Sequence, residues 1–134
     1  MFKISPVQDS QTAKKYMSAV NITEKEGAFV YAMTDLESGE LMGISQFEIG
    51  TDSGYIYDIK EAGEKNDFEA MFILGRQTMN FLEQCGIRYC RAAKDAAEEK
   101  LMKAIGFSEQ NGELLCDMLG MFDGKCSGHK VELN

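Results

Sequence analysis

The chain has 134 residues, of which 44% are hydrophobic and only one is proline, and its formal net charge is −8. This composition predicts a single globular domain and argues against a disordered chain. The negative charge makes nucleic acid an unfavourable partner, because phosphate backbones are bound by basic patches. The sequence has no signal-peptide pattern and no apolar run of the ~18 residues that a membrane helix needs, so we expect a cytoplasmic protein without a membrane partner.

Short segments with alternating apolar and polar residues predict a series of β-strands. In chain order, the expected strands are residues 2–4, 27–35, 41–49, 55–60, 87–92, 107–110 and 113–118. A glycine-containing loop between the second and third strands favours a hairpin, and Asn111-Gly112 suits a type I′ turn in the last one. The segment from 27 to 60 therefore predicts a three-strand antiparallel meander.

Three other segments have apolar residues at helical spacing. The first extends from Ala13 to Val20, with Asp9 or Ser10 as its expected cap. The second is 68–85, with Asp67 as its expected N-cap and Gly86 as its expected C-cap, and the third extends from about 95 to 105. A parallel strand pair needs a crossover of at least a dozen residues, usually a helix, and the second helix has the right length and position for one. The sequence therefore predicts an α/β (α+β) fold.

This order of strands and helices resembles that of the GNAT superfamily of N-acetyltransferases. The resemblance covers nearly the whole chain, and its most recognisable segments are FLEQCGI (81–87) and AEEKLMKAIGF (97–107). It implies a mixed, mostly antiparallel sheet with helices on both faces, in one domain at 1–118 followed by a tail or last strand at 119–134. It also implies transfer of an acetyl group from acetyl-CoA to a small-molecule amine or a protein lysine.

The resemblance also implies where the cofactor would bind. In this family the sheet splays where the strands equivalent to 55–60 and 87–92 separate, and acyl-CoA enters that splay. Its pantetheine pairs with the strand edge, and its pyrophosphate rests on the N-terminus of the following helix. Exposed N–H groups and the helix dipole attract the anion there. Glycines at alternating positions, after an Arg or Gln, let the backbone approach the phosphates closely.

In this chain the corresponding loop has lost those glycines. The residues at the cofactor position are Lys65, Asn66, Asp67, Phe68, Glu69, Ala70 and Met71. Asn66 replaces the Arg or Gln, and Asp67 and Glu69 stand where glycines are usual. Each carboxylate at ~5 Å from a phosphate costs on the order of 3 kcal/mol at an effective dielectric of 20. Lys65 is the only compensating cation, so we interpret this segment as a degenerate acyl-CoA pyrophosphate loop.

The catalytic positions of the family also differ here. Met102 stands where many members have the tyrosine that protonates the CoA thiolate, and methionine has no transferable proton. Cys90, Tyr57 or Tyr89 could replace that tyrosine, and the sequence does not choose among them. Glu48, Asp58 and Glu61 lie on or near the central strands and are possible general bases, and we take Glu48 and Asp58 as the candidates.

The four cysteines are expected to be thiols, and no metal site is expected. Cys126-x-x-His129 supplies only half of the ligands that a structural zinc ion needs. Three hypotheses for the function remain open. The chain is an acyl-CoA-dependent N-acyltransferase, or a catalytically inactive binding or regulatory module that acts through self-association as a homodimer, or a domain that holds a CoA-like or small anionic ligand without acyl transfer.

Overall fold

A twisted seven-stranded sheet forms the centre of the part of the protein that the computed structural model describes, residues 1–122. The strands are β1 (Phe2–Pro6), β2 (Phe29–Asp35), β3 (Leu41–Ile49), β4 (Ser53–Glu61), β5 (Tyr89–Ala92), β6 (Ser108–Gln110) and β7 (Glu113–Asp117). Their spatial order is β1-β2-β3-β4-β5-β7-β6, and every neighbouring pair is antiparallel except the parallel pair β4–β5. This arrangement confirms the predicted mixed, mostly antiparallel sheet.

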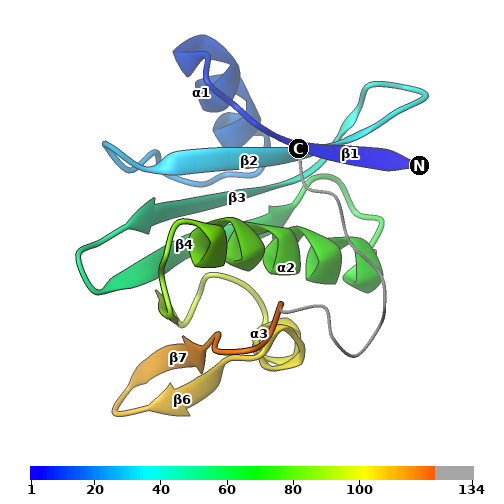
Figure 1. Ribbon diagram of the computed structural model, residues 1–134. Helices are drawn as coiled ribbons and strands as arrows, with labels where there is room; N and C mark the ends of the chain where they lie inside the picture. The colour runs from blue at the N-terminus through cyan, green and yellow to red at the C-terminus, as the bar shows by residue number, and fades with distance from the viewer. Residues whose placement is uncertain (123–134) are drawn as a thin grey trace.

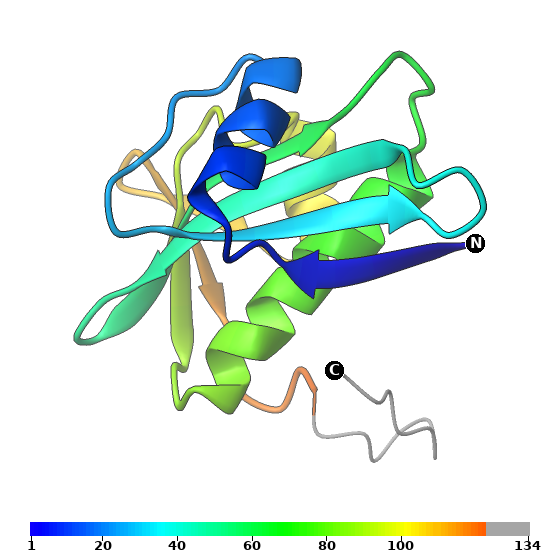
Figure 2. The ribbon, with the colours of Figure 1, turned by 90° about the horizontal axis from the view of Figure 1, so that it is seen from above.

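Helices cover both faces of this sheet, as predicted. The helix α1 (Ser10–Ala19) lies on one face, and α2 (Phe68–Gln84) and α3 (Glu99–Ile105) lie on the other (Figures 1 and 2). Successive side chains of β2 point to opposite faces of the sheet, so this strand contributes residues to the core on each side. Val30 and Ala32 pack in the cluster under α1, whereas Met33 belongs to the larger core under α2 and α3.

The helix α2 follows its sequence signals closely. Asp67 caps its N-terminus, where the side chain accepts a hydrogen bond from the Ala70 N–H at 3.0 Å. Gly86 has a φ of +88°, and Ile87 N–H donates back to the Leu82 carbonyl at 3.1 Å. This is the glycine-terminated C-cap expected from the sequence, and the predicted helix 68–85 is confirmed to within one residue.

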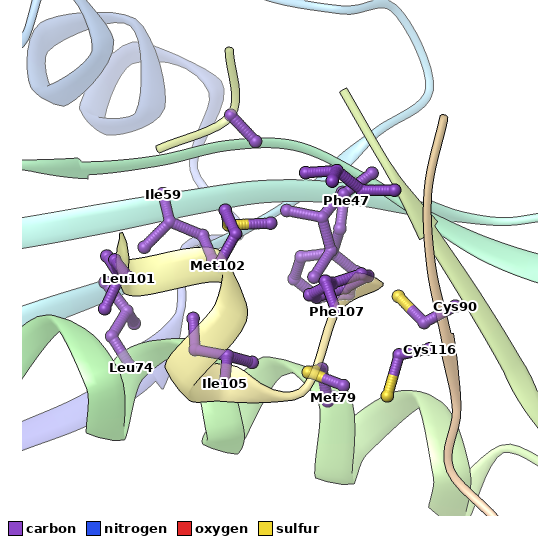
Figure 3. Close-up of a cluster of buried hydrophobic side chains, with 14 of the residues drawn as sticks. Phe47, Ile59, Leu74, Met79, Cys90, Leu101, Met102, Ile105, Phe107 and Cys116 are labelled. Atoms are coloured by element: carbon purple, nitrogen blue, oxygen red, sulfur yellow. The ribbon is translucent and has the colours of Figure 1, made fainter. Parts of the chain in front are cut away.

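The main core lies between the sheet and the helices α2 and α3 (Figure 3). Phe47, Leu74, Met79, Met102 and Ile105 are all fully buried in it. Removing each such side chain from water contributes about 1.5–3 kcal/mol to folding. Met102 is therefore a packing residue.

The third helix begins later than the sequence predicts, and the expected helix of about 95–105 is wrong in its first turn. Residues 93–98 form a loop, and α3 begins at Glu99. The cause is a contact with a distant strand. The Ala96 carbonyl, which in a helix would accept from Lys100, accepts instead from the Ile59 N–H of β4 at 2.8 Å. Ala96 is fully buried in this position.

The helix α1 begins at Ser10, directly after its cap Asp9, and the remaining boundaries agree with the sequence to within two residues. The strand expected at 27–35 begins at Phe29, because the chain turns at Gly27, which has a φ of +81°. In the last hairpin, Asn111 and Gly112 both have positive φ, at 53° and 82°, as a type I′ turn requires.

The C-terminal segment is described only as far as Phe122. Met121 N–H donates to the Met118 carbonyl at 3.0 Å, and Met121 and Phe122 pack against the main core. The rest of the predicted tail or last strand, with Cys126 and His129, lies outside the described residues. Within residues 1–122, no helix is long and apolar enough to cross a membrane, and His, Cys, Asp and Glu side chains form no cluster able to hold a metal ion.

Candidate functional site

The sheet splays beyond the parallel pairing of β4 with β5. The pairing extends from Ser53 opposite Tyr89 to Ile56 opposite Ala92. A last hydrogen bond from Ala93 N–H to the Ile56 carbonyl, at 3.0 Å, closes it. The strand β5 ends there, whereas β4 continues to Glu61, so within residues 1–122 the second half of β4 has no strand on that side.

The loop between β5 and α3 fills this splay. Ile59 N–H donates to the Ala96 carbonyl at 2.8 Å, and the Lys60 ammonium donates to the Asp95 carbonyl at 2.8 Å. Both bonds tie the 93–98 loop to the edge of β4. The backbone donor of Ile59 is therefore already satisfied from within the chain.

Three of the first N–H groups at the N-terminus of α2, those of Asp67, Phe68 and Ala70, also have acceptors within the chain. The first N–H groups of a helix lack helical acceptors, which is why they attract anions. Here the Glu61 carboxylate accepts from Asp67 N–H at 2.8 Å, and the Asp67 carboxylate accepts from Ala70 N–H at 3.0 Å. Phe68 N–H donates to the Asn66 carbonyl at 3.1 Å. Two carboxylates of the chain thus take the place that an external anion would take.

A pocket of about 330 Å³ lies between the end of β4, the start of α2 and the start of α3. Its lining residues are Ile59, Lys60, Glu61, Asn66, Phe68, Met71, Ala97, Glu98 and Leu101. Buried apolar side chains form its inner wall, and Glu61 and Glu98 supply carboxylates. The pocket is large enough for a small organic molecule.

Comparison with solved structures identifies the architecture. The ribosomal-protein-S18-alanine N-acetyltransferase from Escherichia coli superposes with a TM-score of 0.65 at 16% identity, covering 83% of this chain and 80% of that one. A chain of the NatC complex bound to Gag peptide and CoA superposes with a TM-score of 0.66 at 12% identity, and the match covers 87% of this chain and 98% of that one. A GNAT family acetyltransferase from Elizabethkingia anophelis with acetyl-CoA bound superposes with a TM-score of 0.61 at 10% sequence identity. The match covers 87% of this chain and 97% of that one.

The chain has the GNAT fold. At these identities the likeness concerns the fold alone. No protein-family model matches the sequence, and no curated protein matches it.

With the GNAT fold established, the seven residues at the predicted cofactor position can be placed. They form the loop before α2 and its first turn. Residues 65–69 are exposed, whereas Ala70 and Met71 are buried. Asn66 has a φ of +53°, and Asn66, Phe68 and Met71 line the pocket. Asp67 acts as the helix cap, as the sequence predicts.

The candidate base Asp58 is held at a β-bulge in the middle of β4. Gln46 pairs with Asp58 and Phe47 pairs with Ile56, so Tyr57 is the extra residue. Gln46 is fully buried, and its Nε2 donates to the Asp58 carboxylate at 2.9 Å and to the Thr23 carbonyl at 3.0 Å. Asp58 is therefore fixed by a buried amide on the face of the sheet that α1 partly covers.

Gln46 also holds the loop between α1 and β2. Its Oε1 accepts from Lys25 N–H at 2.7 Å, so one buried side chain joins that loop to Asp58. This role of Gln46 was not predicted from the sequence. The only available signal was a polar residue inside an apolar strand pattern, and such a residue must find partners when it is buried.

The second candidate base, Glu48, lies on the same face and interacts with Tyr57. Desolvation, followed by a hydrogen bond with Glu48, raises the pKa of the Tyr57 hydroxyl above its usual value. The Tyr55 and Tyr57 rings are 4.9 Å apart, and the Lys25 ammonium lies 5.7 Å from the Tyr57 ring centroid. We call Glu48, Tyr55, Tyr57 and Asp58 the tyrosine face.

The three candidate proton donors, Cys90, Tyr89 and Tyr57, differ in their exposure to solvent and in their neighbours. Cys90 is fully buried, and desolvation raises the pKa of its thiol strongly, so it is a poor acid. The Tyr89 ring is 40% exposed and lies against the Arg88 guanidinium, 5.0 Å from the ring centroid. Tyr57 is the one that belongs to the tyrosine face, beside both candidate bases.

Proposed function

We propose that this protein is a binding or regulatory module with the GNAT fold that does not transfer acyl groups from acetyl-CoA. The hydrogen bond from Asp67 N–H to the Glu61 carboxylate carries this proposal. A pyrophosphate at this helix terminus would have to displace Glu61 and then lie beside Asp67 and Glu69. Each such like-charge contact costs on the order of 3 kcal/mol at ~5 Å.

The splay supplies a second, independent argument. In the family, pantetheine pairs with the free edge of the strand equivalent to β4. Here that edge donates through Ile59 N–H to the Ala96 carbonyl. A cofactor would have to break a backbone hydrogen bond and move a fully buried residue of the 93–98 loop. This competition for the β4 edge acts on the pantetheine, whereas the electrostatic repulsion acts on the pyrophosphate, so the two effects add.

The catalytic position supplies the third argument. Met102 is fully buried in the core and cannot protonate a departing thiolate. The natural role of such a module is recognition of a ligand or of another protein, including a second copy of itself.

A second candidate function is N-acyl transfer to a small-molecule amine or to a protein lysine, with acetyl-CoA as the donor. The tyrosine face favours it, because Glu48 and Asp58 lie together beside Tyr57 on the central strands. A carboxylate there could take a proton from an attacking ammonium. The names of the structural neighbours also favour it, since they include an alanine N-acetyltransferase and a peptide-bound complex with CoA.

Titration with acetyl-CoA separates the two functions. If the protein is a binding module, we expect no heat of binding at millimolar acetyl-CoA. We also expect no thioester cleavage above background with spermidine or a lysine peptide as acceptor. Micromolar binding would instead support the transferase, and an acceptor screen would then identify the amine.

A further inference from the structure

The pocket at the start of α2 has an apolar wall inside and charged groups at its edge. Ile59, Met71 and Leu101 are 2%, 4% and 6% exposed and form the apolar part. Glu61 comes from β4, and Glu98 directly precedes α3. A volume of about 330 Å³ lies at the lower end of the range for small-molecule sites.

The charges at this pocket favour a cation. Its lining contains two carboxylates, Glu61 and Glu98, and one ammonium, Lys60. The Lys60 ammonium donates to the Asp95 carbonyl at 2.8 Å, so it is held at the β5–α3 loop. Nearby, the cap residue Asp67 and the first-turn residue Glu69 of α2 add two negative charges, and Lys100 against the Phe68 ring adds one positive charge. Clefts lined by one sign of charge concentrate ligands of the opposite sign.

An aromatic ring at the pocket already holds a cation. Phe68 lines the pocket and is 40% exposed, and the Lys100 ammonium lies 5.5 Å from its ring centroid. This distance is within the range of cation–π attraction. A ligand ammonium against this ring would take the place of the ammonium of Lys100, which is an exposed side chain.

We propose that this pocket binds a small organic cation, a primary or quaternary ammonium on a short alkyl chain. The ammonium lies between the Phe68 ring and the carboxylates of Glu61 and Glu98, and the alkyl chain contacts Met71 and Leu101. This inference rests on the proposed function, because a pocket that holds acetyl-CoA would carry an anion there. The charge preference of the cofactor region is thus reversed relative to the family.

Three probes of equal chain length test the charge preference. We would titrate the ¹⁵N-labelled full chain with n-hexylamine, hexanoate and 1-hexanol at pH 7 and follow the backbone amide signals. The expected result is saturable shifts at residues 59–71 and 97–101 with hexylamine, at an affinity at least ten times that for hexanoate. Equal or tighter binding of hexanoate overturns the proposal, and so does hexylamine binding confined to the tyrosine face.

Charge-neutralising variants locate the cation. Glu98→Gln should weaken hexylamine binding about three- to tenfold, and because the Glu98 side chain makes no capping hydrogen bond, the helix should remain intact. Ala97→Leu, which adds volume inside the pocket, should weaken hexylamine and hexanol alike. Glu83→Gln is the matched control, since it removes the same charge from the opposite end of α2. Equal losses in Glu83→Gln and Glu98→Gln would overturn the assignment.

An acetyl-CoA titration of the same sample separates this inference from the proposed function. Hexylamine binding without acetyl-CoA binding supports both. Absence of both kinds of binding overturns the cation site and leaves the non-catalytic module standing. Acetyl-CoA shifts at residues 59–71 overturn both.

Discussion

The carboxylate of Glu61, at the end of β4, accepts a hydrogen bond of 2.8 Å from the backbone N–H of Asp67, the cap of α2. The two residues are six positions apart, and the loop between them includes Gly63 at φ +78° and Asn66 at φ +53°. The loop thus turns back so that the strand's own side chain reaches the helix N-terminus. An acidic group at this terminus is favourable for the helix and unfavourable for an incoming phosphate.

Replacing Asp67 and Glu69 together by glycine should strengthen acetyl-CoA binding. The change removes two negative charges and gives the loop the glycines that let a backbone approach phosphates. The helix should tolerate it, because a glycine cap is only a few tenths of a kcal/mol worse than an aspartate cap and a glycine at position 69 costs about 1 kcal/mol of helix propensity. Calorimetry of the variant against the native chain measures the gain, with Glu64→Gly as the control. An unchanged affinity would mean that the pyrophosphate position is not at these residues.

A double-mutant cycle that exchanges the amide and the carboxylate of Gln46 and Asp58 should show that these two side chains interact. Gln46→Glu places a carboxylate against Asp58 and removes the donor to the Thr23 carbonyl, so it should destabilise the fold by about 2–4 kcal/mol. Adding Asp58→Asn restores a donor between the two side chains and should recover part of that loss. Urea denaturation of the two single variants and the double variant measures the coupling. Additive effects would show that the two side chains do not interact in solution.

The close contact between Gly54 and Leu82 should make β4 intolerant of a side chain at position 54. A Cβ on Gly54 would lie 2.8, 3.0 and 3.3 Å from three atoms of the fully buried Leu82. Overpacking of this kind typically costs 1–3 kcal/mol, so Gly54→Ala should lower the melting temperature. Ser18→Ala, on the exposed side of α1, is a control with no such contact. A melting temperature of Gly54→Ala equal to that of the native chain would contradict the packing of α2 on β4.

Stability should fall in alkaline solution, partly because of Cys90. Desolvation first, and the neighbouring Cys116 second, raise the pKa of this buried thiol above its usual value of 9.0. A raised folded-state pKa gives stability that is present below the unfolded pKa and lost as the pH rises above it. The melting temperature should therefore decline from about pH 9 upward, and less steeply in Cys90→Ala. Cys85→Ala is the control, because Cys85 is exposed, and an identical decline in all three proteins would exclude Cys90 as a source.

Most of the fold is predictable from the sequence because its signals are local. The strand β3 has the predicted bounds, and the Asn111-Gly112 turn follows from the conformations that those two residues accept. The start of α2 follows from Asp67 as a cap. These features depend on residues within a few positions of one another.

The missed features depend on distant residues. The first turn of α3 is absent because the Ala96 carbonyl bonds to Ile59, 37 positions earlier in the chain. The hydrogen bond between Glu61 and Asp67 depends on how the loop between them turns, and no residue pattern predicts that turn. The β-bulge at Tyr57 arises from the register of β3 on β4, with Phe47 opposite Ile56. For the same reason the sequence predicts a candidate cofactor loop but could not show that Glu61 and Asp67 accept hydrogen bonds from its N–H groups.

The most direct test of the central claim is calorimetric titration of the native protein with acetyl-CoA at low and at physiological salt. If Glu61 and the 93–98 loop satisfy the cofactor position from within the chain, no binding heat should appear at millimolar acetyl-CoA at either salt concentration. Micromolar binding would contradict the account, because acetyl-CoA would then displace both the Glu61 carboxylate and the Ala96 carbonyl from their donors.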